Sequence, residues 1–453
     1  NLDVPPTLVS FAVTTDKTEN IVSNEFKKAG NRVVLIKPDY DKNGLPDTTS
    51  LLNVYERVTA LLRSGKAVAC YTPTLGGIAE AVMKMCFGNS LGFKFADNLT
   101  ANEIFGYCYG GFLLEVTENI ADAAEIGEIT ADGKISYNGE EIGLERLLGI
   151  YENKLESVYR CNKENPKTEM QTFSYTAENR VSPAVKTAKP KVLIPVFPGT
   201  NCEYDSAKAM RDAGAEPEIF VINNRSAENV AKSVEDFANS LKTAQMVFIP
   251  GGFSGGDEPD GSGKFITAFF RNAAVKEQVA DLLDNRDGLM CGICNGFQAL
   301  IKLGLVPYGK IIDTDENCPT LTYNTIARHQ SKIVRTRIAS NKSPWLADTE
   351  VGDIYSVPIS HGEGRFIASD ELILRLAENG QIATQYVDEN GQAASDIHFN
   401  PNGSYYAIEG ITSPDGRVFG KMGHSERYAA DLYKNVPGNY DIKMFRSAVK
   451  YFK

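Results

Sequence analysis

The sequence lacks several features that would assign it to a particular environment. No apolar run is long enough to span a membrane, and the N-terminus lacks the basic segment followed by an apolar segment that is typical of a secretory signal peptide. No run of basic residues is present, and the net charge of −11 argues against a nucleic-acid-binding surface. We therefore expect a cytoplasmic globular protein that binds neither membrane nor nucleic acid. Because the first residue is Asn1 rather than Met, we expect this chain to be part of a longer one.

Histidine is scarce, and cysteine is irregularly spaced. There are four histidines and eight cysteines, and scattered cysteines in a long chain suit a reducing compartment better than a disulfide framework. Cys291 and Cys294 form a C-x-x-C pair, but a zinc site would need further ligands, and no second C-x-x-C exists. Cys291 also falls inside a predicted strand. We therefore expect no metal site and no redox dithiol, with Cys291 contributing only to strand packing.

At 453 residues the chain is too long for one core, so two or three domains are expected. Residues 161–190 lose hydrophobic periodicity and are rich in Lys, Glu, Thr, Asn and Pro, which predicts a linker or an extended surface arm between domains 1–160 and 191–453. The first domain has its own alternating elements, with strands predicted at 8–13, 33–36, 67–71 and 112–116 and helices at 50–63 and 78–87.

From Lys191 the pattern becomes a regular β-α-β-α series, which predicts an α/β fold with a doubly wound, mostly parallel sheet. In such sheets the ligand site lies at the carboxyl ends of the strands, so the loops after Phe197, Pro250 and Gly292 should meet at one edge. Beyond Gly304 we expect shorter strands and loops. The predicted strands are 192–197, 218–222, 246–250 and 289–292, and the helices are 205–213, 227–241 and 264–283.

The stretch 292–298, Gly-Ile-Cys-Asn-Gly-Phe-Gln, lies between a predicted buried strand and a predicted helix. Small residues on both sides of a cysteine at such a turn are typical of a nucleophile elbow with sulfur in place of oxygen. A Cβ at Gly292 or Gly296 would clash with neighbouring backbone. Cys294 would lie at the helix N-terminus, where N–H groups and the helix dipole stabilise a thiolate. The alternative is a buried structural cysteine.

A cysteine nucleophile needs a base, and His424 follows an apolar strand two residues before Glu426. If this segment is extended, both side chains point to the same side, so Glu426 can orient the imidazole while its other nitrogen faces the sulfur. His398 lies in a polar, turn-rich stretch and is expected at the surface. The glycine-rich loop 250–257 follows a buried strand, does not fit a P-loop, and could aim backbone N–H groups at an oxyanion.

Several motifs, in this order along the chain, together resemble a class I glutamine amidotransferase domain of the flavodoxin-like type. More narrowly, residues 191–453 resemble the glutaminase domains of phosphoribosylformylglycinamidine synthases. Ser425 departs from the family's common Pro between His and Glu, but serine still permits the extended geometry. The motifs are Pro198–Glu203, Pro250–Asp257, Cys291–Gln298, Ser360–Arg365, Asn400–Ser404 and Gly420–Arg427.

Residues 1–160 also show a resemblance. Pro6–Phe11 and Ser23–Gly30 are similar to the C-terminal half of an aminoimidazole ribonucleotide synthetase-like module. In the large, single-chain form of the synthase, such a half precedes the glutaminase. The resemblance implies a smaller α/β domain of that type, fused to the amidotransferase domain.

The resemblance also implies a role for each motif residue. Cys294 would attack the side-chain amide of L-glutamine, His424 would protonate the leaving ammonia and then activate water, and Glu426 would orient His424. Ammonia would pass to upstream synthetase domains, of the same enzyme or a partner chain, which use ATP and Mg²⁺ to convert formylglycinamide ribonucleotide to its amidine. The glutaminase site itself would need no cofactor. Backbone N–H groups of Gly252, Phe253 and Asn295 would hold the oxyanion, and Gln298 and His361 would help to position glutamine.

Two alternatives remain open on sequence. The first is a cysteine hydrolase or peptidase of similar fold, which would cleave peptides but not glutamine. The second is a catalytically silent fragment that serves as a docking or scaffold element.

Overall fold

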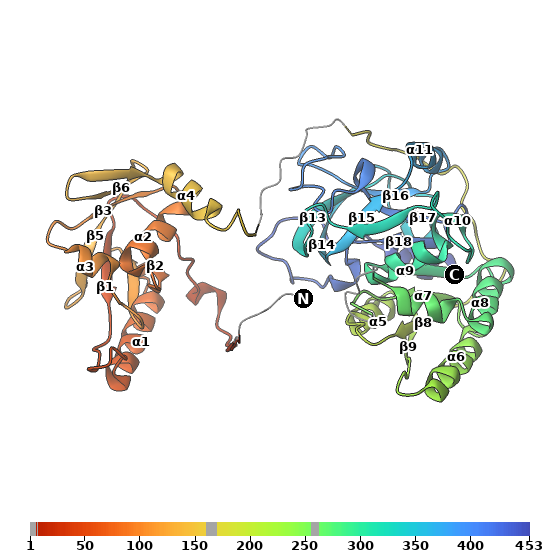
Figure 1. The fold of residues 1–453 in the computed structure, drawn as a ribbon, viewed down its shortest axis with the longest axis horizontal. Coiled ribbons are helices and arrows are strands. Elements are labelled where there is room, and N and C mark those ends of the chain that lie inside the picture. The colour runs from red at the N-terminus through yellow and green to blue at the C-terminus, as the bar shows by residue number, and fades with distance from the viewer. Residues whose placement is uncertain (1–5, 7, 160–169, 255–261) are drawn as a thin grey trace. The chain divides into compact units, whose positions relative to one another are not determined.

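The computed structural model describes residue 6 and residues 8–159, 170–254 and 262–453. The chain divides into two compact units, Asn1–Arg160 and Cys161–Lys453 (Figure 1). The α/β fold class predicted from the sequence is confirmed, since helices pack on a sheet in each unit. Within the described ranges, no helix is both long enough and apolar enough to cross a membrane.

The first unit is built on a seven-stranded sheet of order β2-β4-β1-β5-β3-β6-β7, in which β3 and β6 form the one parallel pair among the described strands. Side chains of the central strand alternate between two cores: Val33 and Leu35 pack with α2, whereas Val34 and Ile36 pack with α1. The elements are β1 (Arg32–Ile36), α1 (Thr48–Arg63), β2 (Ala67–Tyr71), α2 (Gly77–Phe87), β3 (Gly92–Phe95), α3 (Ala101–Phe105), β4 (Phe112–Val116), β5 (Ala124–Thr130), β6 (Lys134–Tyr137), β7 (Glu140–Gly143) and α4 (Leu144–Asn153).

The prediction of a strand at residues 8–13 is wrong. The segment has no regular secondary structure, and Leu8, Val9, Phe11 and Val13 are exposed. Its residues have strand-forming character, but a strand also needs a neighbour that accepts and donates backbone hydrogen bonds. No described strand pairs with this segment.

The second unit is organised by a nine-stranded sheet of order β14-β13-β16-β17-β18-β11-β10-β8-β9. Its parallel half runs from β18 to β9, as predicted, and its antiparallel half runs from β14 to β17. The strands are β8 (Lys191–Val196), β9 (Glu216–Val221), β10 (Met246–Ile249), β11 (Leu289–Ile293), β13 (Gln330–Ile338), β14 (Ile354–His361), β16 (Ile382–Tyr386), β17 (Ile408–Thr412) and β18 (Val418–Lys421), with β12 (Thr320–Tyr323) and β15 (Glu363–Ile367) as a separate pair.

The helix predicted at 264–283 is interrupted. The first segment ends at Phe270 with Arg271 as its C-cap, and Asn272 starts the second, because its side chain accepts a hydrogen bond from the Ala274 N–H as an N-cap. The second segment continues as a π-helical turn over Asp281–Asn285. The second unit's helices are α5 (Glu203–Asp212), α6 (Ala227–Leu241), α7 (Lys264–Phe270), α8 (Ala273–Ala280), α9 (Asn295–Leu303), α10 (Leu305–Tyr308), α11 (Asp370–Glu378) and α12 (Met444–Tyr451).

Of the predicted linker, residues 161–169 lie outside the described residues, and residues 170–190 run along the second unit as an arm. Phe173 of the arm is buried in the core of that unit, and its N–H donates to Gln385 Oε1 at 2.8 Å. Further along, the Tyr175 N–H donates to Ala339 O at 2.8 Å. The arm is therefore held by the same core that carries the large sheet.

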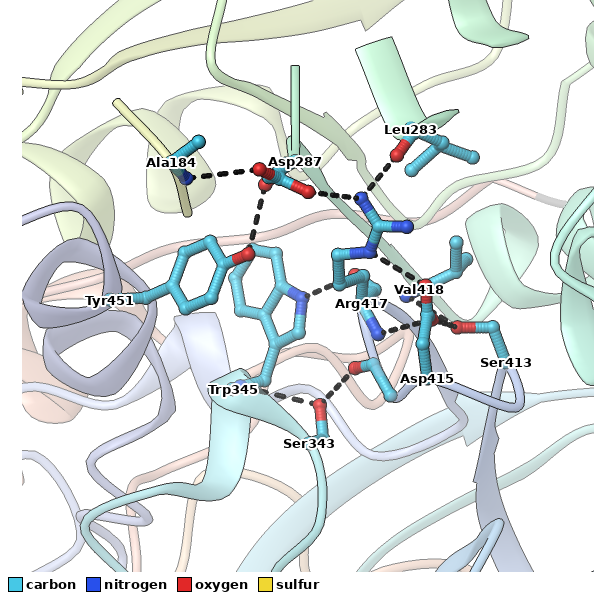
Figure 2. Close-up of polar contacts among 11 residues, drawn as sticks. Ala184, Leu283, Asp287, Ser343, Trp345, Ser413, Asp415, Arg417, Val418 and Tyr451 are labelled. Atoms are coloured by element: carbon cyan, nitrogen blue, oxygen red, sulfur yellow. Dashed lines mark hydrogen bonds and ion pairs between the residues drawn. The ribbon is translucent and has the colours of Figure 1, made fainter. Parts of the chain in front are cut away.

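A polar cluster around Arg417 fastens the arm and the C-terminal helix to the sheet (Figure 2). Arg417 lies just before β18 and contacts Asp415 through Nε at 2.6 Å and Asp287 through Nη1 at 3.3 Å. Asp287 in turn accepts from the Ala184 N–H of the arm and, through its carbonyl, from the Tyr451 hydroxyl of α12. The cluster lies at the end of β18 opposite His424.

Candidate active site

The turn at Cys294 has the strained geometry of a nucleophile elbow. Cys294 joins β11 to α9 with φ +53° and ψ −105°, a conformation that non-glycine residues rarely adopt. A Cβ at Gly292 would lie 2.6 Å from the Gly296 carbonyl carbon, and one at Gly296 would lie 2.1 Å from Ile249 O. The expected clash with backbone is therefore confirmed at both glycines.

The two cysteines of the C-x-x-C pair have different surroundings. Cys294 Sγ lies 3.7 Å from Ser360 O, at the carboxyl edge of the sheet. Cys291 is fully buried within β11, and this burial raises the pKa of its thiol well above the ordinary value. The strand-packing role expected for Cys291 agrees with its position, and all described cysteines are free thiols.

His424 and Glu426 form a buried pair, with Nδ1 and Oε1 2.6 Å apart. The contact is the expected one, but the expected extended backbone is wrong. Ser425–Arg427 is a turn of 3₁₀ helix, and His424 itself has φ −85° and ψ 75°, close to an inverse γ-turn. A tight turn therefore brings the two side chains together. His424 Nε2 has no hydrogen-bond partner among the described residues, which leaves this nitrogen free.

Charge and burial oppose each other in this pair. Burial alone would lower the pKa of His424, but the Glu426 charge and the Cys202 and Cys294 thiols outweigh it, so the pKa lies well above its ordinary value. Burial would raise the pKa of Glu426, but the charge of His424 and its hydrogen bond hold it below the ordinary value. Both directions favour transfer of a proton to His424 opposite an ionised Glu426, and the Cys294 thiol lies close enough to His424 to affect its protonation.

Two loops meet beside this pair, as predicted for the carboxyl ends of β8 and β10. The Phe253 N–H donates to Gly199 O at 2.8 Å, and the Asn201 N–H donates to Gly251 O at 3.3 Å. A Cβ on Gly251 would lie 2.6 Å from His424 Cε1, so the imidazole packs directly on the backbone of this loop. Residues 255–257 of the glycine-rich loop lie outside the described residues.

The backbone N–H groups predicted to hold the oxyanion differ in whether they already have a hydrogen-bond acceptor. Asn295 is the first residue of α9, where a backbone N–H has no intrahelical acceptor. Phe253 has its N–H committed to Gly199 O, so this hydrogen bond must break before Phe253 can serve an oxyanion. The roles of Gly252, Phe253 and Asn295 stay predictions.

The two predicted substrate-binding side chains are both buried, but only His361 leaves a polar atom without a partner. Gln298 Oε1 accepts from Asn295 Nδ2 at 2.9 Å, and its Nε2 donates to Glu363 O at 2.6 Å. His361 Nε2 lies 3.3 Å from Asn402 Nδ2, and His361 Nδ1 has no partner among the described residues. Burial, and to a smaller extent the charges of His424 and another histidine, lower the pKa of His361 to about 3. His361 is therefore a neutral imidazole with one free nitrogen.

Cys202 and Arg427 complete the site and were not assigned from sequence. Cys202 Sγ lies 3.9 Å from His424 Nδ1 and accepts from Arg427 Nη2 at 3.1 Å. Cys202, His424 and Glu426 place potential ligand atoms within 4.8 Å of one another, but a cation there would be repelled by Arg427 and would break the His424–Glu426 bond. Cys202 lies in the loop after β8, which was predicted to reach this edge, so its position was the available signal.

The remaining histidine predicted at the surface, His398, is exposed and contacts Asp396. The fourth, His329, lies at the outer side of the site: its Nε2 is 3.0 Å from Ser360 Oγ, and its ring is 6.1 Å from that of Phe253. His329 lies in none of the recognised motifs, so no role was predicted for it.

Comparison with known proteins identifies the family to which this chain belongs. Residues 189–452 match the family described as "CobB/CobQ-like glutamine amidotransferase domain". The chain is 37% identical over 257 residues to phosphoribosylformylglycinamidine synthase subunit PurQ of Methanococcus maripaludis (strain C7), covering 56% of this chain and 87% of that protein. It is 32% identical over 250 residues to the same subunit of Aquifex aeolicus (strain VF5), covering 55% and 95%. A solved structure described as "Structure of PurLQS from Thermotoga maritima" is 26% identical with a TM-score of 0.43, covering 58% of this chain and 100% of that one.

The match covers more than half of the chain and nearly all of each relative. The chain therefore belongs to the CobB/CobQ-like glutamine amidotransferase family, and its second unit is homologous to PurQ, the glutaminase subunit of phosphoribosylformylglycinamidine synthase.

Proposed function

We propose that the second unit hydrolyses L-glutamine through a Cys294 thioester and releases ammonia for the synthesis of formylglycinamidine ribonucleotide. The observation that carries this proposal is the buried His424–Glu426 pair beside a cysteine on a strained strand-to-helix turn. Family membership makes the amide of glutamine the substrate that fits this arrangement.

The reaction uses the residues in two stages. The Cys294 thiol passes its proton to His424 as the sulfur attacks the side-chain amide carbon of glutamine. The oxygen of the tetrahedral adduct is held by N–H groups at the start of α9 and in the loop after β10. The imidazolium of His424 donates a proton to the departing nitrogen, so ammonia leaves and a γ-glutamyl thioester remains. His424, now neutral, takes a proton from water as the water oxygen attacks the thioester. The departing sulfur takes this proton back from His424, so glutamate is released and the Cys294 thiol is regenerated.

Glu426 and the substrate-binding residues support these stages without exchanging protons with the substrate. The carboxylate of Glu426 remains ionised and keeps His424 oriented through Nδ1. The free Nδ1 of His361 is a buried polar atom available to glutamine. Gln298 makes one hydrogen bond at each end of its amide, to Asn295 and Glu363, so one N–H and one oxygen lone pair remain for glutamine.

The ammonia acceptor is a synthetase module that uses ATP and Mg²⁺, whereas the glutaminase site itself needs no cofactor or metal. We assign residues 1–160 to an aminoimidazole ribonucleotide synthetase-like C-terminal half-module. Its support is the sequence resemblance together with its separation as a compact unit. A cytoplasmic location fits this pathway. Adding the ATP-binding synthetase portion with ATP and formylglycinamide ribonucleotide should raise glutaminase turnover of the full chain, and an unchanged rate would count against this partnership.

The central test is the release of glutamate and ammonia from glutamine by the full chain and by Cys294→Ala. We expect the variant to lose activity and to keep its fold, and Cys291→Ala to keep activity because its thiol is sealed in β11. A glutamine-like chloroketone should label Cys294 in the full chain even if turnover is slow. Full activity in Cys294→Ala would refute the mechanism, and cleavage of peptides but not glutamine would favour a peptidase.

A further inference from the structure

A fully buried ion pair lies next to the segment that carries His424. Lys421 and Glu409 are both 0% exposed, and Nζ and Oε1 are 3.5 Å apart. Glu409 also accepts from Thr384 Oγ1 and, at 2.6 Å, from the Gly423 N–H. Buried ion pairs can often be replaced by apolar residues without loss of stability, so stability alone gives no reason for two charges here.

Lys421 contacts both halves of the site. Its backbone carbonyl accepts from the Cys294 N–H at 2.9 Å. Its ammonium donates to Gly423 O at 3.0 Å and to Ser425 Oγ at 2.9 Å. Gly423 and Ser425 are the two neighbours of His424, so a single residue of β18 is bonded to the nucleophile's backbone and to both sides of the histidine.

The backbone before His424 is held on every side. The Gly423 N–H is taken by Glu409, and its carbonyl is taken by Lys421 and by the Ser425 N–H at 3.1 Å. A Cβ on Gly423 would lie 2.8 Å from Val357 Cγ1, so the space at this position fits glycine and no larger residue. The His424 N–H itself donates to Pro358 O at 2.8 Å.

We propose that Lys421, together with Glu409 and Ser425, is a positioning residue that sets the distance between Cys294 and His424. An ammonium has three N–H donors, and here they face three acceptors: Gly423 O, Ser425 Oγ and Glu409 Oε1. Glu409 supplies the opposite charge that allows the ammonium to remain buried. The role of His424 in this inference rests on the proposed function, whereas the contacts themselves do not depend on it.

The first variant is Ser425→Ala in the full chain, which removes one acceptor of the ammonium and leaves both charges paired. We expect kcat for glutamine hydrolysis to fall by about tenfold or more with KM unchanged, because the geometry of reacting groups changes while the substrate contacts remain. The matched control is Ser413→Ala. Ser413 is also buried and bonded through its hydroxyl, to Asp415 and to the Val418 N–H, but at the other end of β18 (Figure 2). This control should lose stability without losing kcat.

The second variant is Lys421→Met combined with Glu409→Gln, which removes both charges together and so leaves no lone buried charge. Unfolding in urea, followed by the fluorescence of Trp345, establishes that this variant is folded before its kcat is measured. An unchanged kcat in folded Ser425→Ala and in the folded double variant would overturn the proposal, as would an equal kcat loss in Ser413→Ala.

The rate of Cys294 alkylation by iodoacetamide separates this inference from the proposed function. Peptide mass spectrometry reads the modification at Cys294 alone, and the reaction needs no glutamine. Positioning predicts a changed alkylation rate in Ser425→Ala and an unchanged rate in Ser413→Ala. If the wild-type chain hydrolyses no glutamine but these rates differ as predicted, the proposed function fails and the positioning stands. Equal rates in all three proteins would overturn the positioning.

Discussion

His361 should make the second unit sensitive to acid, and replacing it should remove that sensitivity. The side chain is 2% exposed, and its pKa lies at about 3 in the folded protein against 6.5 as the ordinary value. Between these two pH values the unfolded chain binds a proton that the folded chain refuses. Stability therefore falls as the pH falls through this window, which is the direction expected for a histidine whose folded pKa is depressed.

The size of the effect follows from the two pKa values. Each pH unit within the window is worth about 1.4 kcal/mol, so His361 alone removes about 2 kcal/mol between pH 7 and pH 5. His424 acts in the opposite direction, because its folded pKa is raised: between pH 7 and pH 5 the unfolded chain takes up a proton that the folded chain already holds, which favours the folded state at pH 5. This contribution is shared by all the proteins compared below, so it cancels in their differences. Carboxylates with lowered folded pKa values, such as Glu426, lose their contribution only below about pH 4.5.

The assay is urea unfolding at pH 7 and pH 5 for the wild type, His361→Gln and His398→Gln. The chain has one tryptophan, Trp345, buried in the core of the second unit, so its fluorescence reports on that unit alone. The wild type and the exposed-histidine control His398→Gln should each lose about 2 kcal/mol more than His361→Gln on going to pH 5. If all three lose the same free energy, His361 is not a buried neutral imidazole.

Two further substitutions separate the site from its scaffold. In the glutamate-release assay, His424→Ala should lower kcat by about 10²–10⁴-fold, while the kcat of His398→Ala should stay near that of the wild type. The reverse result would mean that the base was wrongly assigned. Gly296→Ala should destabilise the second unit by about 3 kcal/mol, because its Cβ would lie 2.1 Å from Ile249 O. The control Gly149→Ala has open space around the new Cβ and should be neutral or slightly stabilising in thermal unfolding. Equal effects of the two substitutions would refute the clash.

The parallel half of the large sheet and the elbow could be predicted because their signals are local. Buried strands alternate with amphipathic helices from Lys191 onward, and a strand, a small-residue turn and a helix follow one another around Cys294. The pairing of His424 with Glu426 was also predicted, but from an extended backbone that the structure replaces with a 3₁₀ turn. A spacing of two residues fits both geometries, so the contact was right and its cause was wrong.

The contacts that surround these residues depend on chain segments far apart in sequence. Cys202 reaches His424 across 222 residues, and Gln298 meets the Glu363 carbonyl across 65. Nothing in the residues near Gln298 indicates that each end of its amide is bonded to the protein. The segment 8–13 shows the opposite error, since its apolar residues favour a strand that no described edge accepts.

The buried charges explain why the site is harder to read from sequence than the fold. A lysine after an apolar strand ordinarily indicates the point where the strand reaches solvent, yet Lys421 is fully buried. It can remain so because Glu409, twelve residues earlier on β17 and next to the residue that pairs with Lys421, places its carboxylate 3.5 Å from the ammonium. A hydrophobic pattern predicts that such a residue lies at the surface, whereas here its backbone carbonyl accepts from the Cys294 N–H and its ammonium donates to both neighbours of His424. The two charged residues that are least expected in a core, Lys421 and Glu409, therefore belong to the contacts that connect Cys294 to His424.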